Sequence, residues 1–180
     1  MNQHQLEILQ KNNQQSRQAT REALTTALLL LLQEKEYLNI SITELCQKAG
    51  VSRTAFYRNY KSKDEVLDDK IMDYAYKLRQ NIDEDLYQSW LNTFQFVERH
   101  KTDFEVVIKA GLEYKILLAL SVHLPTDPEL RTLQSIWDTV AYVLMIEWVI
   151  HQTPKTAKDM ANLAYQETKQ LRRYWGEKET

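Results

Sequence analysis

Glycine, proline and cysteine are scarce in this sequence of 180 residues, and each shortage excludes a class of structure or chemistry. Three glycines and three prolines leave few positions for tight turns, so the composition predicts helices. Glycines at positions 50, 111 and 176 alone cannot form a phosphate-cradling loop. The single cysteine, Cys46, excludes an intramolecular disulfide and a thiolate metal cluster, and this usage is typical of a reducing compartment.

Long apolar runs are also missing. A membrane-spanning helix needs about 20 predominantly apolar residues in succession, whereas the longest apolar runs here cover residues 27–32 and 140–146. The amide-rich N-terminus lacks the basic start and the apolar core of a secretory signal. We therefore expect a cytoplasmic protein with no membrane partner.

Charge is unevenly distributed in a chain whose formal net charge is −2. No acidic residue occurs between Glu44 and Asp64, although several basic residues do. Such a segment on a helical pattern indicates a polyanionic partner, and a solvated basic surface is the alternative. The basic residues of this segment are Lys48, Arg53, Arg58, Lys61 and Lys63.

The spacing of apolar residues predicts the elements of the N-terminal part. A long helix is expected over residues 15–35, followed by two short helices over 42–49 and 52–60 and by a longer helix from residue 63. Two short helices between two long ones are typical of a helix-turn-helix.

Capping residues support these boundaries. Ser41 and Glu44 form a capping-box pattern at the start of the second helix, and Gly50 tolerates the left-handed backbone that ends it. Ser52 is placed to cap the third helix.

Longer helices without basic bias are expected beyond residue 80, with a break at Gly111. The last two helices, over residues 128–151 and after Pro154, carry apolar stripes with steps of three and four. These stripes predict a homodimer through the last two helices, and burial against earlier helices of the same chain is the alternative. The predicted interface residues are Leu133, Val140, Leu144, Ala161, Ala164, Thr168 and Leu171.

Residues 41–67 resemble the DNA-binding signature of the tetracycline-repressor (TetR) family of transcription regulators. Cys46 stands where the family usually has a small residue, and Tyr60 where it usually has Phe. The remaining chain resembles the family in architecture only. The signature consists of Ala49-Gly50-Val51-Ser52, Phe56-Tyr57, Tyr60 and Ser62-Lys63-Asp64-Glu65.

The resemblance implies an all-α fold of about nine helices. After a disordered tail over residues 1–14, it places a three-helix helix-turn-helix domain over residues 15–62. A helical ligand and dimerisation domain follows over residues 63–180.

The resemblance also makes the third helix the recognition helix, which enters the major groove of double-stranded DNA. Arg53 and Thr54, near its start, are suited to read base edges, and the other basic and aromatic residues to contact phosphates. The predicted DNA-binding residues are Ser41, Thr43, Ser52, Arg53, Thr54, Tyr57, Arg58, Tyr60, Lys61 and Lys63.

By this resemblance the protein is a regulator, most simply a repressor that binds a palindromic operator as a dimer and is released by a small-molecule effector. A TetR-like activator or co-regulator controlled by a protein partner is the alternative. Aromatic residues are candidates for the effector pocket, although helical spacing also fits plain core packing. These candidates are Trp90, Phe94, Phe104, Tyr114, Trp137, Tyr142 and Trp148.

An enzyme is the more remote alternative. The four histidines lack the spacing of a metal site. Glu147 and His151, one helical turn apart, are the only pair that resembles acid–base machinery, and an ion pair at the helix surface or at a dimer interface is the favoured explanation of them. We therefore expect no catalytic residue, no metal and no cofactor.

Overall fold

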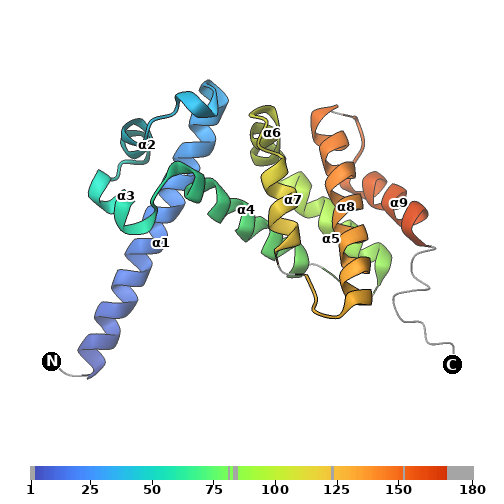
Figure 1. Cartoon of the computed structure of the whole chain (residues 1–180), viewed down its shortest axis with the longest axis horizontal. Helices are drawn as coiled ribbons and strands as arrows, with labels where there is room; N and C mark the ends of the chain where they lie inside the picture. The colour runs from blue at the N-terminus through green and yellow to red at the C-terminus, as the bar shows by residue number, and fades with distance from the viewer. Residues whose placement is uncertain (1–2, 81, 83–84, 123, 152, 170–180) are drawn as a thin grey trace. The chain divides into compact units, whose positions relative to one another are not determined.

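The computed structural model describes residues 3–80, 82, 85–122, 124–151 and 153–169. Within these ranges the chain forms nine α-helices, one 3-10 turn and no strand (Figure 1), which confirms the predicted all-α fold. The helices are α1 (Gln3–Glu34), α2 (Ile42–Ala49), α3 (Arg53–Asn59), α4 (Lys63–Gln80), α5 (Leu86–Arg99), α6 (Lys101–Lys109), α7 (Tyr114–Ser121), α8 (Pro128–Ile150) and α9 (Ala157–Thr168), and the 3-10 turn is η1 (Tyr37–Asn39).

The chain divides into two compact units, Met1–Lys70 and Ile71–Thr180. The division falls inside α4, whereas the sequence places it before this helix. The first two turns of α4 therefore belong with the helix-turn-helix.

In the N-terminal unit, α1, α2 and α3 pack against one another. Leu24 of α1, Leu45 of α2 and Phe56 of α3 are fully buried in their shared core. Burying each such side chain contributes roughly 1.5–3 kcal/mol of transfer free energy. Gly50 adopts φ +67° at the C-terminus of α2, as its predicted role in the turn requires.

The first half of α1 lies outside this core. The sequence predicts a disordered tail over residues 1–14, whereas α1 extends back to Gln3 in the structure. Residues 5–19 are all exposed, so tertiary packing does not stabilise this extension.

In the C-terminal unit, α5 packs along α9, and α8 contacts α5, α6, α7 and α9. Trp90 and Phe94 of α5 and Trp148 of α8 are almost completely buried. The ring of Trp90 stacks on that of Trp137 with centroids 3.6 Å apart. Gly111 adopts φ +71° between α6 and α7, in agreement with the predicted break.

Helix α8 is long and apolar enough to cross a membrane by length and composition, with a mean hydropathy of 1.2 over its best 18 residues. The sequence predicts no membrane span here, because the longest uninterrupted apolar run of this helix covers only residues 140–146. Leu133, Trp148 and Val149 of α8 are buried inside the unit, and α8 contacts four other helices. One such helix is weak evidence for a membrane span, because core helices of globular proteins have the same length and composition. Only 33% of its apolar window is buried, so α8 packs in the unit with one face and leaves the other exposed.

The apolar stripe of α9 is covered within the chain rather than left for a partner. Ala161, Ala164 and Thr168, predicted at a dimer interface, are buried, and α9 packs mainly on α5. The indole Nε1 of Trp90 donates a 2.8 Å hydrogen bond to Thr168 Oγ1. The structure thus favours the alternative for this stripe, because α5 supplies its cover.

The other predicted interface residues lie on α8 or beyond α9. Leu133 is buried, whereas Val140 and Leu144 are half-buried. Leu171 lies outside the described residues.

Candidate nucleic-acid interface

Helix α3 begins at a serine that the sequence identifies as its cap. Ser52 Oγ accepts a 3.1 Å hydrogen bond from the amide of Ala55. The cap fixes the rotation of α3, so that Phe56 points into the core and the side chains of Arg53 and Thr54 lie in solvent.

The exposed face of α3 and of the turn after it carries unpaired basic charge. Arg53, Arg58 and Lys61 are exposed, and the structure gives none of them an ion pair within the described ranges. Lys35 and Lys48, elsewhere in this unit, pair with glutamates. A cluster of positive charge available to a polyanion therefore lies around α3, apart from the exposed Lys11 and Arg17 of α1.

Tyr57 and Tyr60 occupy opposite environments. The Tyr57 side chain is 52% exposed on the basic face, where a phosphate contact is feasible. Tyr60 is 4% exposed, and its hydroxyl donates a 2.6 Å hydrogen bond to Asp69 Oδ2. The prediction that Tyr60 contacts DNA is therefore corrected, because its ring is core and its hydroxyl is engaged.

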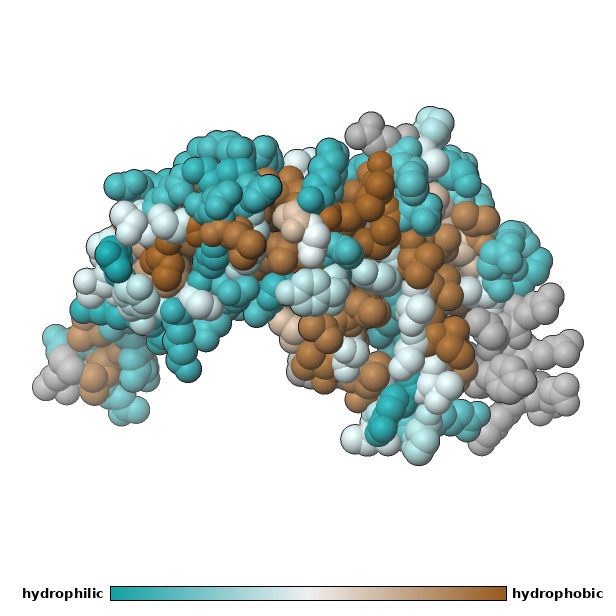
Figure 2. Space-filling view, turned by 45° about the horizontal axis from the view of Figure 1, so that its top comes forward, coloured by the Kyte–Doolittle hydropathy of each residue, from teal (hydrophilic) through white to brown (hydrophobic). Residues whose placement is uncertain are grey.

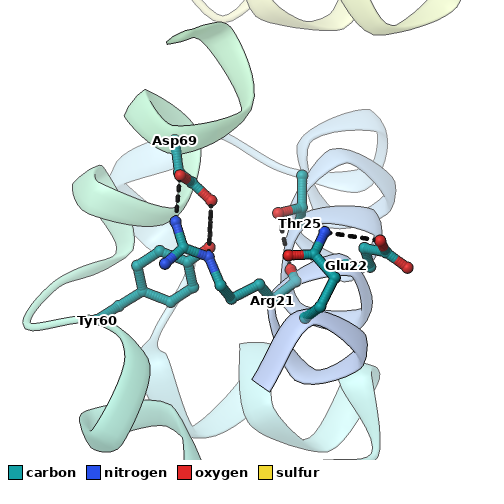
Figure 3. Close-up of polar contacts among 6 residues, drawn as sticks. Arg21, Glu22, Thr25, Tyr60 and Asp69 are labelled. Carbon is teal, nitrogen blue, oxygen red and sulfur yellow. Dashed lines mark hydrogen bonds and ion pairs between the residues drawn. The ribbon is translucent and has the colours of Figure 1, made fainter. Parts of the chain in front are cut away.

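Arg21, Tyr60 and Asp69 form a polar trio that joins three elements of the N-terminal unit (Figure 3). The Arg21 guanidinium of α1 donates two hydrogen bonds to the Asp69 carboxylate of α4 and lies 5.0 Å from the centroid of the Tyr60 ring. Burial and the Asp69 carboxylate raise the pKa of the Tyr60 hydroxyl, so Tyr60 stays a neutral donor. The trio ties the residue that ends α3 to both long helices of this unit.

Lys63, at the start of α4, is also engaged within the chain. Its Nζ donates to the carbonyl oxygens of Tyr37 at 2.6 Å and Ile40 at 2.7 Å. The same ammonium lies 4.4 Å from the centroid of the Tyr37 ring. A third, longer bond reaches the carbonyl oxygen of Leu38 at 3.5 Å, so all three donors of Lys63 have acceptors in and beside η1. Lys63 therefore holds η1 in place, and a phosphate contact would have to replace one of these bonds.

The start of α2 presents the other predicted contacts. Ser41 Oγ accepts from the amide of Glu44, as predicted, and both Ser41 and Thr43 are exposed. The Glu44 carboxylate reaches Lys35 Nζ at 2.5 Å instead of completing the capping box. This bond lowers the pKa of Glu44, and it leaves one half of the predicted motif unused.

Cys46 lies in the core of the same unit, 3% exposed. Burial raises the pKa of its thiol, although the charge of Arg53 acts in the opposite direction. A protonated, shielded thiol is a packing group rather than a reactive one.

The aromatic residues predicted to line an effector pocket separate into three groups. Trp90, Phe94 and Trp148 are completely packed, as is Phe104, whereas Tyr114 is half-exposed on α7. Trp137 and Tyr142, also predicted, line a narrow cleft in the C-terminal unit, between α4, α5, α7 and α8.

The same cleft includes two polar residues that the sequence analysis missed, Arg79 and Asp138. Asp138 is the only acidic residue between Leu130 and Ile146 of a strongly apolar helix. A single acidic residue in an apolar stretch of helix is the sequence signal that could have identified Asp138 as a candidate site residue.

No cluster of three or more His, Cys, Asp or Glu side chains is arranged to hold a metal ion in the described part of the chain. Glu147 and His151 form an exposed pair, with Glu147 Oε2 3.2 Å from His151 Nε2. A pair of this kind at the helix surface, away from the cleft, has the geometry of a simple i, i+4 contact.

Comparison with known protein families gives one match that covers more than half of the chain. The model of the family described as "Family of unknown function (DUF6262)" matches residues 6–105. This chain belongs to the DUF6262 family. The match includes the whole helix-turn-helix and continues through α5 into α6, so α3 and the cleft helices α4 and α5 lie within the DUF6262 region.

Known relatives of this DUF6262 chain connect it to regulators. The uncharacterized HTH-type transcriptional regulator YxbF of Bacillus subtilis (strain 168) is 23% identical over 174 residues. The match covers 83% of this chain, and the chain spans 44% of the length of that relative.

Solved structures share the fold across both units. Lin0861 from Listeria innocua superposes with a TM-score of 0.69 at 18% identity, covering 86% of this chain and 91% of the other. The TetR transcriptional regulator from Streptococcus agalactiae 2603V has a TM-score of 0.62 at 18% identity, with coverage of 87% and 97%. The predicted likeness to the TetR family is thereby confirmed, and at this identity it establishes the fold.

Proposed function

We propose that this DUF6262 chain is a DNA-binding transcriptional regulator of the TetR type. The single observation that carries the proposal is the face of α3: a Ser52-capped helix exposes Arg53, Thr54 and Arg58 with no acidic neighbour in its first turn. Lys61 and Tyr57 extend this surface. Arg53 and Thr54 suit base edges, and the others suit phosphates, which fix register.

The regulator acts as a homodimer through the exposed side of α8. Ile136 and Val143 are exposed large apolar residues on this helix, and a shallow hollow lies beside Ile136 and Val140. Figure 2 shows apolar atoms gathered on the surface of the C-terminal unit. Two copies that cover this face against each other would present two α3 helices to a palindromic operator.

The regulation proposed is repression relieved by a small-molecule effector. An effector that binds one arrangement of the C-terminal helices more tightly than another shifts the population between them. Helix α4 belongs to both units, so its movement changes the separation of the two α3 helices and weakens binding to half-sites of fixed spacing.

The decisive experiment selects preferred duplexes from a random pool with the full chain and then measures binding by fluorescence anisotropy at several salt concentrations. We expect the affinity to fall steeply with salt, because each neutralised phosphate releases counterions. Arg53→Ala is expected to weaken the preferred duplex roughly 10-fold and to relax the choice of base at one position. Lys61→Ala is expected to weaken all duplexes alike and to reduce the salt slope by about 1.

Lys158→Ala is the matched control. Lys158 is exposed on α9, and its loss changes the net charge by the same amount as either variant. A salt-independent affinity, or an equal loss in Lys158→Ala and Arg53→Ala, overturns the proposal.

A further inference from the structure

A cleft in the C-terminal unit lies between the last turns of α4 and helices α5, α7 and α8. The empty space between its walls is about 440 Å³ with the open solvent at its mouth included, and only about 20 Å³ of it is wide enough to hold the centre of a water molecule. Its walls are almost entirely apolar, with Val97, Ile116, Leu120 and Met145 among them. The cleft is therefore narrow and apolar, and a guest larger than water enters only when its walls move apart.

Asp138 places a carboxylate oxygen in this cleft without a partner. The residue is only 6% exposed. Its Oδ1 accepts a 2.9 Å hydrogen bond from Gln134 Nε2, whereas its Oδ2 is buried and accepts none from the described residues. A buried acceptor of this kind costs about 1–3 kcal/mol of stability unless something donates to it.

Arg79 places the complementary group in the same cleft. One terminal nitrogen of its guanidinium donates to the carbonyl oxygen of Leu120, which fixes the side chain. Its Nε is buried and has no acceptor among the groups that the structure describes. Among the described residues that line the cleft, Arg79 Nε is thus a buried donor and Asp138 Oδ2 a buried acceptor, each without a partner.

The charges of the cleft walls decide which ligand fits. Among the described residues that line the cleft, Arg79 and Asp138 carry opposite charges, which cancel when both are ionised. The Glu113 carboxylate is not in the lining but acts on the Tyr142 hydroxyl, which is. An ammonium ligand would be attracted by Asp138 and repelled by Arg79, and a carboxylate ligand would meet the reverse. A neutral group that both donates and accepts satisfies the two residues together, and a hydroxyl is such a group, as is a water molecule that the ligand would displace.

We propose that this cleft binds a small, neutral, largely apolar molecule with a hydroxyl group, such as a simple phenol, whose hydroxyl donates to Asp138 Oδ2 and accepts from Arg79 Nε. The assignment names the effector class and so rests on the proposed function, although the binding itself requires no DNA. Trp137 and Tyr142 then act as walls for the apolar part, as the sequence analysis expects.

The test is isothermal titration of the full chain, without DNA at pH 7.5, with a series of one shape and four polar ends. The series comprises 4-ethylphenol, ethylbenzene, 4-ethylbenzylamine and 4-ethylbenzoate. We expect 4-ethylphenol to bind at least 10-fold more tightly than each of the others. An equal affinity for ethylbenzene, a preference for either charged member, or no binding of 4-ethylphenol overturns the proposal.

Two variants and one control assign the effect to the cleft. Asp138→Leu removes the acceptor and is expected to bring the 4-ethylphenol to ethylbenzene ratio close to 1. Asp138→Asn keeps the size of the side chain and its bond to Gln134, and it is expected to lose about 10-fold in affinity for 4-ethylphenol. Glu147→Gln makes the same chemical change at an exposed site of α8 and is expected to bind like the wild type.

Binding of 4-ethylphenol and binding of DNA are measured separately, so each can fail without the other. Arg53→Ala is expected to lose its DNA preference and to keep 4-ethylphenol binding. A wild type that binds its selected duplex but not 4-ethylphenol overturns the ligand assignment alone. A wild type that binds 4-ethylphenol with the expected selectivity but shows no salt-dependent DNA binding supports the ligand assignment and overturns the regulator.

Discussion

Arginine and aspartate side chains come together in both units of the chain, with opposite outcomes. In the N-terminal unit, Arg21 and Tyr60 both donate to Asp69, so this carboxylate is satisfied from two sides. In the C-terminal unit, Arg79 and Asp138 line one cleft, yet Arg79 Nε and Asp138 Oδ2 each lack a partner among the described residues.

This difference distinguishes a contact that stabilises the fold from a pair of residues that could bind a ligand. The Arg21–Tyr60–Asp69 trio satisfies its own hydrogen bonds and needs no other molecule, so its effect is on the stability of the N-terminal unit. The Arg79–Asp138 pair leaves buried polar atoms unsatisfied, which costs stability, and a ligand that satisfies them recovers that cost on binding. The same two residue types therefore stabilise the fold in the N-terminal unit and form the proposed ligand site in the C-terminal unit.

The largest effect is expected from Asp69→Ala. The substitution leaves the buried Tyr60 hydroxyl without an acceptor and the Arg21 guanidinium without its carboxylate. We expect a loss of about 2 kcal/mol in the free energy of unfolding, measured by urea denaturation. The partial exposure of Arg21 and Asp69 keeps the loss below that of a fully buried ion pair.

Asp73→Ala is the control for this variant. Asp73 pairs with Lys77 on the exposed surface of the same helix, one turn after Asp69. A surface pair of this spacing contributes about 0.3–0.5 kcal/mol. If both variants lose the same small amount of unfolding free energy, the trio does not stabilise the N-terminal unit, and the contrast between the two units is wrong.

A smaller effect, of about 1 kcal/mol, is expected from Tyr60→Phe, since the ring remains packed and Arg21 still pairs with Asp69. Tyr57→Phe makes the identical change on the exposed face of α3. We expect Tyr60→Phe to lower stability with DNA affinity unchanged, and Tyr57→Phe to lower DNA affinity a few-fold with stability unchanged. Urea denaturation and anisotropy on the selected duplex measure both quantities, and a loss of DNA affinity in Tyr60→Phe would return this residue to the DNA contacts.

Local features of this chain could be predicted from the sequence because their causes are local. Ser41 and Ser52 cap the helices that follow them, since a cap involves residues only three positions apart. Gly50 and Gly111 break helices at positive φ because few other residues adopt that backbone.

Long-range pairing could not be predicted in the same way. The periodicity of α9 shows which of its faces is apolar, but both α5 and a second copy could cover that face. The spacing of Tyr60, four residues after Phe56, places its ring on the inward face, but the sequence does not show that Asp69 accepts a hydrogen bond from its hydroxyl. Arg79 and Asp138 are 59 positions apart in sequence, so nothing in the spacing relates them.

The smallest effect, opposite in sign to that of Asp69→Ala, is expected from Asp138→Asn. Burial raises the pKa of Asp138 above its ordinary value of 3.8, although the Gln134 hydrogen bond and the Arg79 charge lower it. Between its unfolded and folded pKa values Asp138 binds more protons in the folded chain, so its own contribution to stability falls as pH rises from about 4. Asparagine does not ionise, and the variant avoids this loss.

Urea denaturation at pH 4 and pH 7.5 compares the variant with the wild type. We expect a stability difference in favour of Asp138→Asn that grows from pH 4 to pH 7.5. Glu147→Gln on the same helix is expected to show no such growth, because its carboxylate is exposed. If Asp138→Asn is instead less stable than the wild type at pH 7.5, the carboxylate already has its hydrogen-bond partners within the chain. Arg79 and Asp138 then stabilise the fold, as the Arg21–Tyr60–Asp69 trio does, and do not form a ligand site.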